Sequence, residues 1–318
     1  MRILLTGGAG FIGSHLGQRL LARGDELVVL DNFNDFYAPA IKRSNAALLS
    51  GARIVEGDIR DQTLVQSLFR ETKLDAVVHL AAMAGVRPSL VDPLYYGDVN
   101  VRGTQILLRE VEHRPGVRFV FASSSSVYGS NDKVPFREDE DIHHPISPYA
   151  ATKRAGELLC FTHHHLYGTP ISCLRFFTVY GPRQRPEMAI HAFVKKCLAR
   201  EPIPFFGDGT TRRDYTYIDD IIDGTLRALD RANGYEVYNL GESQTVSLSE
   251  LIELVAELCG VEPVLDRKPL QPGDVLITYA DVSKARRLLG YEPKTPLRVG
   301  LERFVDWYRS RPGGGRAD

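Results

Sequence analysis

Nearly continuous apolar runs alternate with amphipathic segments in the first half of the chain. The runs "RILLTGG", "ELVVLDN", "AVVHLAA" and "RFVFASSSS" each have the length of one strand, and "SHLGQRLLARG" has the spacing of a helix. Strands read as continuous apolar runs when helices cover both faces of a parallel sheet. The pattern therefore predicts an α/β fold, a doubly wound parallel sheet, over residues 1–178.

The pattern changes after residue 178. Pro- and Gly-rich pieces such as "GPRQRPEM" and "LQPGDV" are interrupted by the helix-like "LSELIELVAELCG". This composition predicts a smaller C-terminal α/β substrate domain over the carboxyl ends of the strands, where ligands of open α/β sheets bind. We assign residues 179–212 and 242–312 to it. Residues 213–241 are expected to return to the first domain through the strand "EVYNLG", and residues 313–318 to form a disordered tail.

Charge and cysteine usage exclude several classes of partner. Lys and Arg total 39 against 40 for Asp and Glu, so no broad attraction to nucleic acid or to an anionic membrane is expected. The four cysteines are far apart in sequence, and the run from His163 to His165 points in diverging directions on a helix, so no metal site is predicted. The start "MRILLTGG" resembles neither a signal peptide nor a membrane anchor, which favours a cytoplasmic protein.

A glycine loop joins the first predicted strand to the first predicted helix. In "LLTGGAGFIGSHL", Gly7, Gly10 and Gly13 allow a tight turn whose backbone N–H groups meet a pyrophosphate at the helix N-terminus. Asp31 ends the next strand, where its carboxylate can accept hydrogen bonds from both ribose hydroxyls and would repel a 2′-phosphate. The chain thus has the pattern of a Rossmann domain that binds NAD rather than NADP.

Asp58, after "ARIVEG", is predicted to lie beside the adenine, although an ordinary loop acid explains it nearly as well. The predicted cofactor-binding set is Gly7, Gly10, Phe11, Ile12, Gly13, Asp31, Asn32, Asp58, Ile59, Leu80, Ala81, Ala82, Tyr149 and Lys153.

The segment "SPYAATKRAGE" carries the candidate chemistry. If it is helical, Tyr149 and Lys153 stand four positions apart on one face, and Pro148 suits the first turn. A free tyrosine has a pKa of about 10 and is a poor base at neutral pH. We expect the Lys153 ammonium and a cationic nicotinamide to lower the pKa of Tyr149. Ser124 and Ser126, in the serine run, are expected to share a substrate proton with Tyr149, although a polar loop at a strand end is the alternative.

Together, "GGAGFIG", "SSSSVYG" and "YAATK" resemble the extended short-chain dehydrogenase/reductase family of nucleotide-sugar enzymes over nearly the whole chain. In that family, dehydratases and UDP-glucuronate decarboxylases carry an acid just before "VYG", where this chain has Ser125 and Ser126. The segments "DNFNDFYAPAIKR", "AAMAGVRPS", "RFFTVYGPRQRPEMA", "GTTRRDYTYIDD" and "QPGDVLITYADVSKA" are similar to those of the UDP-glucuronate 4-epimerases.

The resemblance implies 4-epimerisation of a UDP-hexuronic acid through a transient 4-keto sugar, with tightly bound NAD regenerated in each cycle, in a homodimer. It implies that Arg185 and Thr178 hold the sugar carboxylate, that Arg213 meets the pyrophosphate, that Phe206 or Phe205 lies near the uracil, and that Asn100 supports the active-site helix. Arg185 as a solvated loop cation remains the alternative. The predicted substrate-binding set is Ser124, Ser125, Ser126, Thr178, Arg185, Phe206, Arg213 and Asp274.

Three other functions remain open at this point. The first is a UDP-glucose/UDP-galactose 4-epimerase, the second a UDP-glucuronate decarboxylase, and the third a non-catalytic NAD-binding sensor. The presence of Tyr149, Lys153 and the serine run argues against a sensor, which has no use for them.

Overall fold

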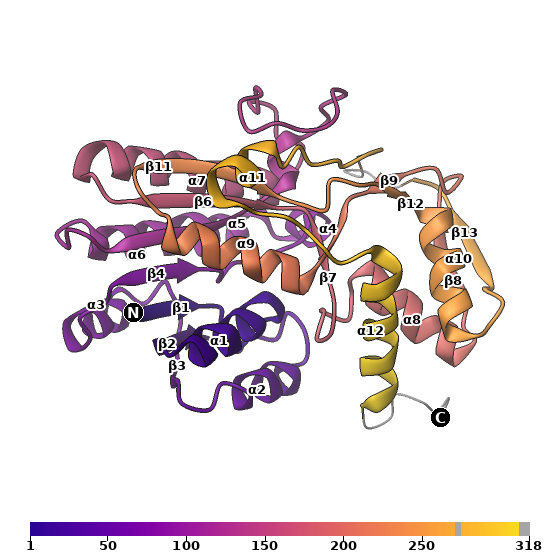
Figure 1. Ribbon diagram of the computed structural model, residues 1–318, viewed down its shortest axis with the longest axis horizontal. Coiled ribbons are helices and arrows are strands. Elements are labelled where there is room, and N and C mark those ends of the chain that lie inside the picture. The colour runs from indigo at the N-terminus through magenta and orange to yellow at the C-terminus, as the bar shows by residue number, and fades with distance from the viewer. Residues whose placement is uncertain (271–274, 312–318) are drawn as a thin grey trace.

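A seven-stranded parallel sheet forms the centre of the computed structural model, which describes residues 1–270 and 275–311. The strand order is β11-β6-β5-β4-β1-β2-β3 (Figure 1). Strands β2 and β3 are therefore added on one side of β1, and the later strands, from β4 on, are added on its other side. Its strands are β1 (Arg2–Thr6), β2 (Glu26–Asp31), β3 (Arg53–Glu56), β4 (Ala76–His79), β5 (Arg118–Ser124), β6 (Ile171–Phe176) and β11 (Tyr235–Leu240). The predicted doubly wound fold is confirmed.

The register of the sheet brings the carboxyl ends of the strands to one edge. Thr6 of β1 pairs with Leu30 of β2 on one side and with His79 of β4 on the other. Loops that leave these strands therefore start beside one another, which is where ligands bind in open α/β sheets.

Helices cover both faces of this sheet. α1 and α9 pack together on one face, and α3, α6 and α7 pack in sequence on the other. The helices of this part are α1 (Phe11–Arg23), α2 (Pro39–Ala47), α3 (Gln62–Glu71), α4 (Val86–Val91), α5 (Pro93–Gly97), the π-helical η1 (Asp98–Arg102), α6 (Gly103–Val111), the 3-10 turn η2 (Ser125–Tyr128), α7 (Pro148–Tyr167), α9 (Ile218–Asp230) and α11 (Ser283–Leu289). Ile3, Leu4 and Leu5 are all fully buried, because helices lie against both sides of β1.

Later segments build a second lobe, at the right of Figure 1. Helix α10 packs against α8 and α12, and a short parallel pair of strands, β8 and β13, lies beside them. These elements are α8 (Ala189–Ala199), β8 (Ile203–Phe206), α10 (Leu248–Cys259), β13 (Leu265–Lys268) and α12 (Leu297–Ser310). Two short ladders, β7 (Thr178–Tyr180) with β10 (Tyr215–Tyr217) and β9 (Arg212–Arg213) with β12 (Val246–Ser247), connect the two lobes.

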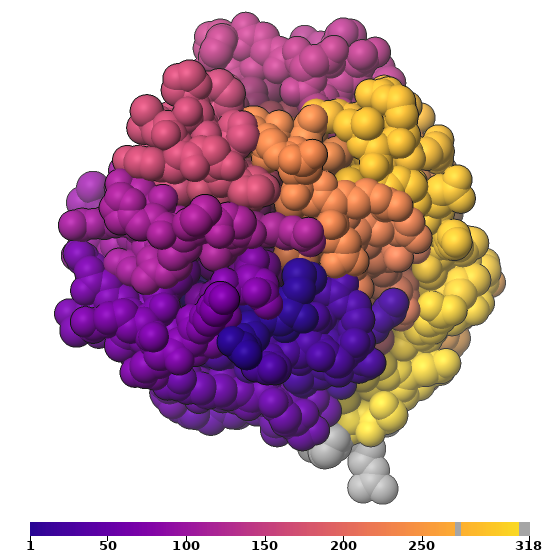
Figure 2. All heavy atoms as spheres, turned by 60° about the vertical axis from the view of Figure 1, so that its left-hand side comes forward, coloured from indigo at the N-terminus to yellow at the C-terminus, as the bar shows by residue number. Residues whose placement is uncertain are grey.

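A late helix, α11, packs back on the first part of the molecule. α11 contacts α9 and β11, and the late segments border the early ones on the face seen in Figure 2. The predicted tail, residues 313–318, lies outside the described residues.

Candidate active site

A cavity of about 510 Å³ lies at the carboxyl ends of the central strands and extends to the second lobe. It gathers residues that the sequence predicts for cofactor and substrate. Those lining it are Gly7, Gly10, Phe11, Ile12, Gly13, Asp31, Asn32, Asp58, Ile59, Leu80, Ala81, Ala82, Ser124, Ser125, Ser126, Tyr149, Lys153, Thr178, Arg185 and Arg213. Segments far apart in the sequence thus form one site.

The glycine loop has no room for side chains. A Cβ atom at Gly13 would lie 2.2 Å from the Gly7 carbonyl oxygen, and one at Gly7 would lie 2.7 Å from the Ala81 nitrogen. Gly7 also has φ +71°, a conformation that L side chains rarely adopt. Gly10, the N-cap of α1, provides no side-chain cap. The first-turn N–H groups of α1 therefore face a cradle that fits a pyrophosphate.

The carboxylates of Asp31 and Asp58 line the same cavity. Asp31 is buried, and its oxygens accept from the backbone N–H groups of Ala9 at 3.0 Å and Phe33 at 2.9 Å. Asp58 accepts from the Asn32 amide at 2.9 Å. Hydrogen bonds from Arg60 hold the pKa of Asp58 at about 2, so this acid is ionised at neutral pH. The arrangement fits the adenosine half of NAD, since carboxylates can accept from ribose hydroxyls.

Helix α7 begins where the sequence predicts. The Ser147 hydroxyl caps it by accepting from the Ala150 N–H at 3.1 Å, and Pro148 occupies the first turn. Tyr149 and Lys153 then lie on one face, with the Lys153 ammonium 5.9 Å from the centre of the Tyr149 ring.

The pKa of Tyr149 in the protein alone depends on burial, Ser124 and Arg185. Burial raises the pKa of Tyr149, while a hydrogen bond with Ser124 and the charge of Arg185 act in the lowering direction. The Lys153 ammonium instead donates to the Ala122 carbonyl oxygen at 2.7 Å, and burial lowers the pKa of Lys153 to about 8. The lowering of the Tyr149 pKa by Lys153 together with a cationic nicotinamide stays a prediction, and in the protein alone the charge that acts in this direction is that of Arg185.

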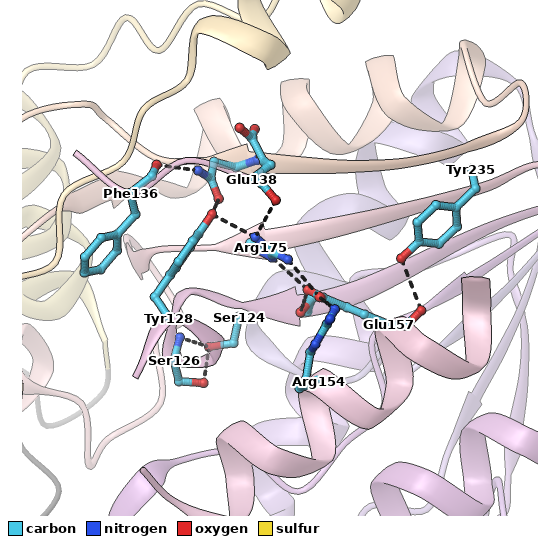
Figure 3. A network of polar contacts seen from close by, with 11 residues as sticks. Ser124, Ser126, Tyr128, Phe136, Glu138, Arg154, Glu157, Arg175 and Tyr235 are labelled. Atoms are coloured by element: carbon cyan, nitrogen blue, oxygen red, sulfur yellow. Dashed lines mark hydrogen bonds and ion pairs between the residues drawn. The ribbon is translucent and has the colours of Figure 1, made fainter. Parts of the chain in front are cut away.

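The serine run turns from β5 into η2. The Ser124 hydroxyl accepts from the Ser126 N–H at 3.2 Å and bonds with the Ser126 hydroxyl at 3.0 Å (Figure 3). The two hydroxyls thus lie side by side next to Tyr149, which is the arrangement needed to pass a proton between a sugar hydroxyl and the phenol.

A buried polar network lies behind the serine run (Figure 3). Glu157 of α7 accepts two hydrogen bonds at 2.9 Å from the Arg175 guanidinium of β6, and one at 2.6 Å from the Ser123 hydroxyl of β5. Arg175 also donates to the Tyr128 hydroxyl at 2.9 Å, which donates to Asn239 at 2.7 Å. The network fixes α7 against the serine strand.

Asn100 lies in η1, a π-helical segment, and joins three parts of the site. Its amide exchanges hydrogen bonds with the Met83 N–H at 2.7 Å and the Met83 carbonyl at 2.9 Å, and donates to the Thr152 hydroxyl of α7 at 3.0 Å. These contacts are those of the supporting residue that the sequence predicts.

Arg185 lies on a loop between β7 and α8 that is tied to the first part of the molecule. The Arg183 guanidinium donates to the Gln18 side chain at 2.7 Å, and His15 bonds with the Pro182 carbonyl at 2.8 Å. The Arg185 guanidinium itself pairs with Glu187 at 2.9 Å. Arg185 is therefore presented to the cavity by an anchored loop.

One predicted substrate residue that the structure describes is not part of this cavity lining. Phe206 lies outside it, half-buried on β8, with the Arg87 guanidinium 4.8 Å from the centre of its ring. Asp274 lies outside the described residues. Arg213 and Thr178 both line the cavity.

Sequence reasoning missed several residues that line the cavity. Phe36, Tyr37 and Lys42 enter from the loop after β2 and from α2, and Met83 and Ala84 from the loop after β4. Their segments, "DNFNDFYAPAIKR" and "AAMAGVRPS", are similar to those of known enzymes, but nothing in their spacing indicates which side chains face the cavity.

Within residues 1–270 and 275–311, His, Cys, Asp and Glu side chains form no group of three that is arranged to hold a metal ion. No helix of the described chain has the length and apolar character needed to cross a membrane.

A dinucleotide cradle beside a Tyr–Lys–Ser group defines an NAD-dependent enzyme of the short-chain dehydrogenase/reductase class. The chain belongs to the NAD dependent epimerase/dehydratase family, whose model matches residues 3–241.

Curated relatives and a solved structure are similar over almost the full chain. The chain is 44% identical to UDP-glucuronate 4-epimerase 4 of Arabidopsis thaliana, over 99% of this chain and 76% of that protein. It is 43% identical to UDP-glucuronate 4-epimerase of Thermodesulfobacterium geofontis, over 96% of this chain and 95% of that protein. The crystal structure of UDP-glucuronic acid 4-epimerase from Bacillus cereus with UDP-glucuronic acid and NAD is 40% identical, has a TM-score of 0.91, and covers 96% of this chain and 98% of that chain.

Proposed function

We propose that this protein catalyses the NAD-dependent 4-epimerisation of UDP-glucuronate to UDP-galacturonate. One observation carries the proposal: Arg185 lines the same cavity as Tyr149, and its charge acts on the Tyr149 phenol. A cation beside the reacting hydroxyl suits a sugar that carries a carboxylate, and a neutral hexose has no matching charge. The three similar proteins named above support the same function, since all of them are UDP-glucuronate 4-epimerases.

Bound NAD supplies a hydride acceptor that is regenerated within the cycle. The glycine loop would hold its pyrophosphate, and Asp31 would hold its adenine-side ribose. Lys153 lines the same cavity, with its ammonium 5.9 Å from the centre of the Tyr149 ring. These residues fit NAD because Gly7 and Gly13, where an added Cβ would meet backbone atoms, let the chain turn tightly at the N-terminus of α1, a position suited to a pyrophosphate.

Tyr149 is the base for the sugar's 4-hydroxyl. Ser124 and Ser126 contact the sugar oxygen and pass its proton to the phenol oxygen, since their hydroxyls are already bonded to one another. The Ser124 bond and the Arg185 charge favour the phenolate against the effect of burial. Tyr149 later returns the proton when the 4-keto sugar has presented its other face, so no proton is gained or lost over the cycle.

Arg185 has a second task with a uronic acid. A carboxylate beta to a transient ketone loses carbon dioxide when it rotates perpendicular to the carbonyl plane. A guanidinium that holds both carboxylate oxygens opposes this rotation. Thr178 and Ser125, which line the same cavity, are further donors for the group.

The test follows purified protein with UDP-glucuronate by proton NMR of the anomeric signals, without added NAD. UDP-galacturonate is expected, and Tyr149→Phe protein is the control. A pentose product would make the protein a decarboxylase. No change with UDP-glucuronate or UDP-glucose, after NAD is added, would reject the epimerase and favour a sensor. Turnover of UDP-glucose alone would favour the neutral-sugar epimerase.

The finer assignments belong to the same proposal. They are a homodimer in the cytoplasm, a first domain of residues 1–178 that binds NAD, and a second lobe that binds the nucleotide sugar. Arg213 is assigned to the pyrophosphate of the UDP-sugar because it lines the cavity at the side of the second lobe. Chemical cross-linking and sedimentation measure the oligomer.

A further inference from the structure

Arg185 is held by residues from opposite parts of the chain. Its guanidinium carbon lies 5.4 Å from the centre of the Phe36 ring, while its Nε lies 2.9 Å from the Glu187 carboxylate. Glu187 is a near neighbour in sequence, but Phe36 belongs to the loop that follows β2 in the first part of the molecule. Phe36 itself lines the cavity.

We propose that the Phe36 ring is the platform that fixes the Arg185 guanidinium, and that Phe36 is thereby a specificity-determining residue for acidic over neutral sugars. The inference rests on the proposed function, because it assigns Arg185 to the sugar carboxylate. It adds a positioning residue that neither the glycine loop nor the Tyr–Lys group contains.

The loop that carries Phe36 is rigid for a chemical reason. Three side chains of this segment each accept from the backbone N–H group two residues further on: Asp31 from Phe33 at 2.9 Å, Asn32 from Asn34 at 3.2 Å, and Asn34 from Phe36 at 3.2 Å. Such side-chain turns fix a short loop without regular secondary structure.

Helix α2 adds a further support. The Lys42 ammonium, on a buried side chain, donates to the Asn34 carbonyl at 2.8 Å and also to the Asn34 side chain. Phe36 is thus tied to Asn34, which is held from two directions. The loop directly follows Asp31, the last residue of β2, so the residue predicted to bind the cofactor ribose and the platform under Arg185 are joined by one hydrogen-bonded segment.

The geometry of a guanidinium explains why a platform matters. Its donors all lie in its plane, so an aromatic ring on one face leaves the edges available for a planar, two-point contact with a carboxylate. The Glu187 carboxylate contacts Nε of Arg185, so the other edge of the Arg185 guanidinium faces away from Glu187. Without the ring, the long side chain regains rotamer freedom that it must lose when the substrate binds.

The test measures binding by calorimetry in NAD-loaded Tyr149→Phe protein, in which turnover is blocked. Phe36→Leu is expected to weaken UDP-glucuronate binding by about three- to tenfold, the range of a cation–π contact at a partly buried site, and to leave UDP-glucose binding unchanged. Phe36→Tyr keeps an aromatic face and is expected to restore UDP-glucuronate binding. NAD content is measured in every variant.

A double-substitution cycle isolates the pair. In protein that also carries Arg185→Ala, Phe36→Leu is expected to have no further effect on UDP-glucuronate. Phe33→Leu is the matched control, since Phe33 lies on the same loop and packs under a different arginine, Arg43, at 4.7 Å, outside the cavity lining.

Several results would overturn the inference. Phe36→Leu could leave UDP-glucuronate binding unchanged, or could weaken the binding of UDP-glucuronate and UDP-glucose equally. It could also weaken UDP-glucuronate binding by the same factor when Arg185→Ala is already present. Finally, Phe33→Leu could cause the same selective loss of UDP-glucuronate binding. Turnover of the unsubstituted enzyme is measured separately. If that enzyme fails to epimerise UDP-glucuronate while the binding results hold, the proposed reaction is wrong and the Phe36–Arg185 subsite for an acidic sugar stands.

Discussion

Glu157 of α7 and Arg175 of β6 face one another in a buried two-point ion pair, with both N–O distances at 2.9 Å. Tyr149, Lys153 and Glu157 are spaced four apart, so they lie along one face of the same helix. Lys153 bonds to the backbone of Ala122 and Glu157 to the side chain of the next residue, Ser123. The helix is therefore fixed to β5 at two consecutive strand positions, directly before the serines of the proposed site.

Replacing Arg175 with Met should lower the free energy of unfolding by about 3 kcal/mol, the lower end for a broken buried pair, because the Glu157 carboxylate would lose its two-point partner and keep only one cation, the Arg154 guanidinium at 3.2 Å. Denaturant unfolding followed by circular dichroism measures the loss. Arg137→Met is the control, since Arg137 pairs with Asp139 on the exposed surface and its loss should leave the midpoint unchanged. A loss of similar size in both variants would contradict a special role for the buried pair.

Replacing Tyr149 with Phe should reduce turnover of UDP-glucuronate by at least about a hundredfold, the lower range for loss of a general base. Bound NAD should remain, because the glycine cradle and Asp31 are unchanged. Released NAD, measured by absorbance after denaturation, checks the second point. Activity retained in this variant would remove Tyr149 from the mechanism.

Much of the main sheet could be predicted from sequence because its signal is local. β1, β2, β4 and β5 are continuous apolar runs, and helices on both faces require such runs. The short strands β9 and β12 could not be predicted, since two residues carry no periodicity. They form because their partners are brought together by the rest of the fold.

The distinction between local patterns and contacts made only by the fold also applies to the site. Tyr149 and Lys153 could be paired from a spacing of four, since both belong to one helix. The contact between Phe36 and Arg185 joins two loops from different parts of the chain, so no local pattern indicates it. The position of the Lys153 ammonium was also beyond prediction, because it depends on the carbonyl of Ala122 in a neighbouring strand.

Replacing Gly156 with Ala should displace α7 from β5. A Cβ atom there would lie 2.2 Å from the end of the Phe121 ring, which is buried beneath the Lys153 ammonium. Overpacking of this kind costs about 1–3 kcal/mol, and the shift should also lower kcat because α7 carries Tyr149. Gly97→Ala is the matched control, since Gly97 is helical and open space surrounds the added methyl group. Thermal unfolding and steady-state kinetics of both variants provide the measurement, and equal effects would count against the packing argument.

Glu242 should make stability depend on pH. One oxygen of its carboxyl group is buried and has no hydrogen-bond partner among the described residues. Burial, together with the nearby charges of Asp220 and Asp214, raises the pKa of Glu242 from 4.5 to about 8. Between these two values the folded protein holds a proton that the unfolded chain has released.

The sign follows from proton linkage. Because the folded state binds more protons in this window, the stabilisation is fully present below about pH 4.5 and is lost as the pH rises to about 8. Glu242→Gln mimics the protonated group, so its melting temperature should be close to that of the unsubstituted protein at pH 5 and higher than it at pH 8.5. Glu253→Gln, at an exposed position of α10, controls for the loss of one negative charge. A difference in melting temperature between Glu242→Gln and the unsubstituted protein that stays constant from pH 5 to 8.5 would show that Glu242 is not protonated in the folded state. Other contacts would then stabilise the carboxylates of Glu242, Asp220 and Asp214.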